Sequence, residues 1–77
     1  MNLLEEVLEI HYDVLMIGED YLIKRDGLSA EQKMVFNNTV DEEIELFENL
    51  WQSSSYDLEE EYEELLEIQL LLSNDVL

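Results

Sequence analysis

The stretch that decides the fold is residues 3–24, which read LLEEVLEIHYDVLMIGEDYLIK. Spacings of four and three residues alternate along one apolar row, formed by Leu3, Val7, Ile10, Val14, Ile17 and Tyr21. Residues three and four apart share one face of an α-helix, so this row predicts an amphipathic helix over 3–24. Asn2 and Glu5 have the spacing of an N-terminal capping box. Lys24 and Arg25 suit the negative end of the helix dipole, where we expect the helix to stop.

A second apolar row lies one position further round the same helix and comprises Leu4, Leu8, His11, Leu15 and Leu22. At about 100° per residue, the two rows together cover about half of the helix circumference. Three short helices offer less burial than this surface needs, so we expect part of it to contact a partner.

The segment after this helix predicts a second one over 30–52. Ser29 and Gln32 have capping-box spacing. One apolar row follows, formed by Phe36, Val40, Ile44, Phe47 and Trp51. Residues 37–39, Asn-Asn-Thr, are poor helix formers, and Thr39 could cap a new helix, which makes this segment a candidate break.

The remaining chain predicts a third helix over 57–73, after a loop of three serines at 53–55 and with Ser55 or Asp57 as its cap. Its inward row is Leu58, Tyr62, Leu65, Gln69 and Leu72. The chain has no proline and two glycines, and no segment alternates as a strand does. We therefore predict a single acidic domain over residues 1–77, with the all-α fold of an up-down-up three-helix bundle.

The composition is strongly acidic, with 21 Asp and Glu against three Lys and Arg, a net charge of −18. The chain is nevertheless 47% hydrophobic, so we expect it to fold rather than to be disordered. Nucleic acid and membrane surfaces are anionic, which argues against both as direct partners. The first residues lack the basic region of a secretion signal, and no apolar run reaches the roughly 18 residues of a membrane span. These features predict a cytoplasmic protein with a basic partner.

Catalytic and metal-binding patterns are not found in the sequence. The chain has no Cys and a single histidine, His11, which lies within an apolar row and is expected to be packed there. Position 8 is Leu, so the Glu-x-x-His pattern of di-iron bundles is absent. A catalytic pair of carboxylates needs one buried member, so that the two pKa values differ and one group acts as acid and the other as base. The glutamates of this sequence are all expected to be exposed to solvent. We therefore expect no enzymatic activity, no metal and no cofactor.

The acids themselves form rows along the expected helices. Residues four apart on a helix lie about 6 Å apart, close to the roughly 6–7 Å between neighbouring phosphates of a DNA strand. Like charges at this spacing cost about 0.2–0.5 kcal/mol per pair, and no base follows Lys33 to relieve them. Solubility needs a net charge of only about 2–8. The candidate partner-binding acids are Asp41, Glu42, Glu45, Glu48, Asp57, Glu59, Glu60, Glu63, Glu64 and Glu67.

In size, charge and these rows, mainly over 41–48 and 57–67, the chain resembles small acidic DNA-mimic proteins, which are often phage-encoded. The resemblance covers the whole chain loosely and includes no diagnostic motif. It implies an inhibitor that competes with DNA for the basic surface of a nucleoid protein such as HU, or of a restriction, CRISPR or repressor protein. Lys24, Arg25 and Lys33 depart from the pattern, and we expect them at one end of the bundle, away from the main acidic face.

Other interpretations remain open at this point. The acids could be an ordinary solvated face, or an adaptation to high salt. An adaptor or antitoxin-like module would instead bind its partner through the apolar surplus of the first and third helices. The same surplus predicts a homodimer, unless the tail folds back over the bundle. The candidate dimer interface is Leu66, Leu70, Leu71 and Val76.

Overall fold

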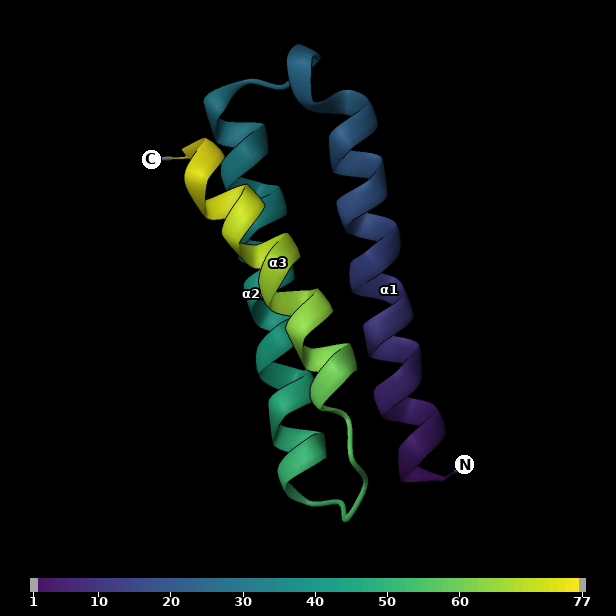
Figure 1. Ribbon diagram of the computed structural model, residues 1–77. Coiled ribbons are helices and arrows are strands. Elements are labelled where there is room, and N and C mark those ends of the chain that lie inside the picture. Colours follow the sequence, from purple (N-terminus) through teal and green to yellow (C-terminus); the bar gives the residue numbers. More distant parts are fainter. Residues whose placement is uncertain (1, 77) are drawn as a thin grey trace.

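Three α-helices account for almost all of residues 2–76, which the computed structural model describes (Figure 1). They are α1 (Leu3–Lys24), α2 (Ala30–Gln52) and α3 (Glu59–Val76), and a short 3₁₀ helix, η1 (Arg25–Gly27), follows α1. The chain runs along α1, returns along α2 and runs forward again along α3, and each helix packs against the other two. The predicted all-α, up-down-up three-helix bundle is confirmed.

The starts of α1 and α2 follow from local caps. The side chain of Asn2 accepts a hydrogen bond from the backbone N–H of Glu5, at 2.8 Å. At α2, Ser29 Oγ accepts from the N–H of Gln32 at 3.2 Å, and Gln32 Oε1 accepts from the N–H of Ser29 at 2.8 Å. These bonds satisfy backbone donors that a helix start leaves unpaired. The bounds 3–24 and 30–52 are both confirmed.

The break considered near 37–39 is wrong, because α2 is continuous from Ala30 to Gln52. The hydroxyl of Thr39 donates to the carbonyl oxygen of Val35 at 2.8 Å, one turn back, instead of capping a new helix. Val40 and Ile44 are buried against the other helices. Burying such side chains stabilises by about 1.5–3 kcal/mol each, which outweighs propensity losses of about 0.7 kcal/mol or less per residue.

The third helix starts and ends later than the predicted 57–73. Asp57 Oδ1 accepts from the N–H of Glu59 at 3.4 Å, and the carbonyl of Leu58 accepts from the N–H of Tyr62 at 2.9 Å. The helix therefore begins at Glu59. At its other end, the side chain of Asp75 is bonded to α1 and η1, and the helical turn continues to Val76.

One buried cluster lies along the bundle axis and draws on all three helices. Its members are Val7, Ile10, Val14, Tyr21, Val40, Ile44, Phe47, Leu58, Leu65 and Leu72. The inward row expected for the third helix is confirmed, with Tyr62 and Gln69 half-buried at its edge. The second row of α1 is buried only in part, because Leu8 and Leu22 remain exposed.

Gly18 lets α1 approach α3 closely. A Cβ atom at this position would lie 3.1 Å from Cγ2 of Ile68, tighter than ordinary van der Waals contact. The glycine is buried within α1, so its role is packing rather than a special backbone conformation.

Across residues 2–76, no helix combines the length and the apolar character that crossing a membrane requires.

Candidate functional site

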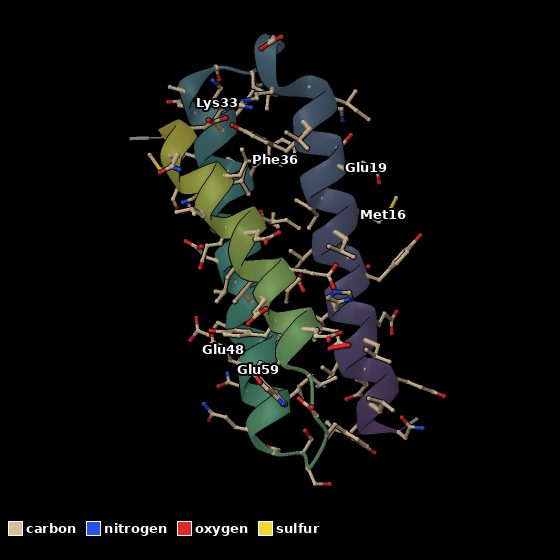
Figure 2. All side chains as sticks on the ribbon, in the orientation of Figure 1. Met16, Glu19, Lys33, Phe36, Glu48 and Glu59 are labelled. Carbon is tan, nitrogen blue, oxygen red and sulfur yellow. The ribbon has the colours of Figure 1, made fainter. Side chains whose placement is uncertain are left out.

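The chain's three Lys and Arg residues gather at the end of the bundle that holds η1. Lys24 Nζ lies 3.1 Å from Asp20 Oδ2, and Arg25 Nη2 lies 2.6 Å from Asp75 Oδ1. Lys33 lies at the same end, whereas Glu48 and Glu59 lie toward the opposite one (Figure 2). The position expected for these bases is therefore observed, and the rest of the bundle surface carries carboxylates without Lys or Arg beside them.

Asp75 is held in place by two donors. Besides Arg25, the hydroxyl of Tyr21 donates to its Oδ2 at 2.5 Å. The hydrogen bond from Tyr21, followed by that from Arg25, lowers the pKa of Asp75 below its usual value. Burial, with the bond to Asp75 adding to it, raises the pKa of Tyr21 to about 12. Both oxygens of Asp75 are bonded within the bundle and its side chain is 10% exposed, so this carboxylate is unsuited to binding a partner.

Two of the candidate acids join α2 to α3, each through one carboxylate oxygen. Glu48 Oε1 accepts from the hydroxyl of Tyr62 at 3.1 Å, and Asp41 Oδ1 accepts from Nε2 of Gln69 at 2.9 Å. Burial, with Glu48 second, raises the pKa of Tyr62 above its usual value. Both carboxylates are half-buried along the seam between the helices. Their hydrogen bonds fix the position of α2 relative to α3, and part of each carboxylate side chain remains exposed at the surface.

Further carboxylates flank this seam. Glu45 is exposed one turn from Asp41 on α2, and Glu59 and Glu63 are exposed one turn apart on α3. At about 100° per residue, Glu45 and Glu59 lie on the sides of their helices that border the seam, and Glu63 lies about 100° from Tyr62, at the outer edge of this surface. We call the resulting surface the α2–α3 acidic face, and its residues are Asp41, Glu45, Glu48, Glu59 and Glu63.

The other candidate acids point elsewhere. Glu64 faces α1, where its Oε1 lies 3.6 Å from Nε2 of His11. By helical position, Glu60 and Glu67 lie on the outer side of α3, and Glu42, about 100° from Asp41, lies at the outer edge of the α2–α3 acidic face. The ten acids proposed from the sequence therefore do not form one surface.

A hollow of about 370 Å³ at the start of α3 is lined by acids alone, namely Asp57, Glu59, Glu60, Glu61 and Glu63. Three of them lie in the first turn, where the positive end of the helix dipole favours negative charge. Part of the high charge density around residue 60 therefore has a structural cause.

The four candidate dimer residues divide into two pairs. Leu66 and Leu70 are exposed, and by helical position they continue the line of Glu59 and Glu63 along α3. Leu71 packs against the core, and Leu71 and Val76 are half-buried. Only the first pair offers a substantial free apolar surface.

Exposed apolar side chains are most numerous on α1, and they are Leu8, Tyr12, Met16, Leu22 and Ile23. Ile23 is 79% exposed. Met16 points away from α2 and α3, as does the neighbouring Glu19 (Figure 2). The unburied surplus expected on the first helix is therefore present.

His11 is a residue of α1 and its side chain, 15% exposed, lies against α3. Its Nε2 atom is buried without a hydrogen-bond partner among residues 2–76, and the 3.6 Å separation from Glu64 becomes an ion pair only when the imidazole is protonated. In the same part of the chain, no group of three or more His, Asp or Glu side chains is arranged to hold a metal ion.

Sequence reasoning missed Leu46 on α2, which is 48% exposed and lies outside the apolar row of that helix. Its spacing of four from Leu50 is the signal that could have found it.

Comparison of the chain with protein-family models, curated proteins and solved structures finds no match.

Proposed function

We propose that the protein is a DNA-mimic inhibitor that occupies the DNA-binding surface of a basic protein with its α2–α3 acidic face. The observation that carries this proposal is a set of five carboxylates on two adjacent helices, at a distance from the paired bases of the η1 end. An acidic face kept only for solubility would tolerate interspersed lysines, and none follows Lys33.

The spacing of these carboxylates suits a surface that normally holds phosphates. Acids one turn apart along α2 or α3 are separated by about 6 Å, and packed helix axes lie about 8–10 Å apart. Two roughly parallel lines of negative charge result. Arg and Lys side chains that contact DNA phosphates can pair with such lines, and salt would weaken the complex steeply. Glu48 and Asp41 are anchored by α3, so their positions are preorganised before binding.

The test starts with immobilised protein and bacterial lysate, with capture repeated in excess duplex DNA and over a salt series. The proposal expects capture of a DNA-binding protein that DNA displaces and salt releases. With that protein purified, the triple variant Glu45→Gln, Glu59→Gln and Glu63→Gln should weaken binding about tenfold or more.

The matched control removes three exposed acids elsewhere, through Glu5→Gln, Glu19→Gln and Asp26→Asn. It should change binding less than about threefold. If both triple variants lose affinity equally, only net charge matters, and mimicry by this face is wrong. Capture that is indifferent to DNA would also contradict the proposal.

A second candidate function is an adaptor that binds a partner through α1. The observation that favours it is the exposed apolar surface of that helix, with Tyr12 61% and Ile23 79% exposed. Under this alternative, Met16→Ser with Ile23→Ser abolishes capture and the Gln variants of the acidic face do not. DNA and salt then have little effect on the captured partner.

A further inference from the structure

A groove between α1 and α2 combines an apolar floor with a line of acids on its α1 side. It encloses about 400 Å³ and is lined by Glu6, Glu9, Ile10, Asp13, Leu46 and Leu50. The floor includes Leu46, which leaves 48% of its surface exposed although it lies beside the core residue Ile10. An apolar floor of this kind is stabilised when another apolar group covers it.

The acids of the groove have a definite spacing. Glu6, Glu9 and Asp13 follow one another by three and four residues on α1. They therefore form one line of about 10 Å along the side of the helix that borders α2. No Lys or Arg lines the groove beside them.

We propose that this groove binds a basic amphipathic helix of a protein partner. Apolar side chains of such a helix would cover Leu46 and Leu50, and its Lys or Arg residues would meet the acid line. Cations spaced by three and four residues on the partner match the spacing of Glu6, Glu9 and Asp13. The long aliphatic stems of Lys and Arg would add contacts with the floor while their charged ends reach the carboxylates.

Charge decides against a second copy of this chain as the occupant. A second copy brings a net charge of −18, and Lys24 and Arg25 are already paired with Asp20 and Asp75. The groove also lies on a different side of α2 from the α2–α3 acidic face, so it goes beyond the proposed DNA mimicry and can be tested separately.

The experiment measures binding of a labelled helical peptide by fluorescence anisotropy. The probe has about 18 leucine and lysine residues, with the leucines at helical period. An isomer of the same composition with the leucines scrambled is the first control, because it keeps the charge and loses the apolar face. We expect the amphipathic peptide to bind at least about tenfold more tightly than the isomer.

Matched variants then locate the site. Leu46→Asp should weaken the amphipathic peptide about tenfold, whereas Leu70→Asp, at an exposed leucine of α3, should change its affinity less than about twofold. Glu9→Gln with Asp13→Asn should weaken it more than Glu60→Gln with Glu67→Gln, which removes the same charge from α3. Circular dichroism checks the fold, and the two charge pairs decide the result if Leu46→Asp does not fold.

Three outcomes would overturn the proposal. The scrambled isomer could bind as tightly as the amphipathic peptide, which would show that binding depends on charge alone and not on the apolar floor of the groove. The α1 and α3 charge pairs could have equal effects. Sedimentation velocity could show a dimer that Leu46→Asp dissociates, which would make a second copy the occupant. Substitutions in the α2–α3 acidic face test the proposed DNA mimicry and alter no residue of the groove. If they abolish competition with DNA, the proposal for the groove is unaffected.

Discussion

Tyr21 and Asp75 are 54 residues apart in the chain and are joined by a hydrogen bond of 2.5 Å between the phenol hydroxyl and the carboxylate. Arg25 reaches the same carboxylate through Oδ1. The last turn of α3 is thereby attached to the end of α1, at the only end of the bundle that carries Lys or Arg side chains. These bonds hold the last turn of α3, which continues to Val76, against α1 and η1.

Removal of this hydrogen bond should destabilise the bundle. Tyr21→Phe keeps the buried ring and leaves Arg25 as a partner of Asp75, so we expect a loss of about 1–2 kcal/mol in the free energy of unfolding. Urea titration followed by circular dichroism measures it. Asp20→Asn breaks the exposed pair with Lys24 and should change little. Equal effects of the two substitutions would show that the hydrogen bond of the Tyr21 hydroxyl stabilises the fold no more than an exposed ion pair does.

Stability should also fall at alkaline pH because of Tyr21. Its pKa is raised to about 12 in the folded state, whereas an unfolded tyrosine titrates near pH 10. Its contribution is therefore fully present below about pH 10 and is lost as pH rises toward 12. We expect the urea midpoint to decrease over this interval, and to decrease less in Tyr21→Phe.

The control for this pH series is Tyr56→Phe, at an exposed tyrosine. It should follow the pH profile of the unchanged protein. Tyr62, whose pKa is also raised, contributes to the decrease with the same sign. A profile of Tyr21→Phe identical to that of Tyr56→Phe would contradict the prediction.

The contact between Gly18 and Ile68 predicts a coupled pair of substitutions. Gly to Ala within a helix is worth about 1 kcal/mol in propensity, but the new Cβ atom would meet Ile68 at 3.1 Å. We expect Gly18→Ala to stabilise the protein only when Ile68→Ala has cleared that space. Thermal unfolding of both single variants and the double variant measures the coupling. Strictly additive changes would mean that the close approach carries no strain.

Self-association through Leu66 and Leu70 should respond to salt in the opposite direction from partner binding. Two copies of a chain with a net charge of −18 repel each other. We therefore expect the dimer fraction in sedimentation equilibrium to rise with salt, because screening weakens this repulsion. Leu66→Ser with Leu70→Ser should leave a monomer at all salt concentrations, while Leu8→Ser, at an exposed leucine of α1, should not. A dimer that survives the first change must use another surface.

The candidate site could be predicted from the sequence only in part. Helical spacing identified which acids are neighbours along one helix, as with Glu59 and Glu63. It did not show that Glu64 faces His11, or that Glu48 and Asp41 are bonded across the seam by Tyr62 and Gln69. Leu71 looked as available as Leu70 in the sequence, yet it packs against the core.

The sequence by itself determined the bounds of α1 and α2, because caps such as Asn2 and Ser29 and rows of apolar residues act over three or four positions. It also determined the excess of negative charge and the apolar surplus of α1. Tertiary structure alone decided that α2 continues through 37–39, since burial of Val40 outweighs weak local propensity. It also decided where α3 ends and which carboxylates share a face. Those outcomes depend on how far each helix is rotated toward its neighbours, and residues such as Tyr21 and Asp75 meet only after the bundle has formed.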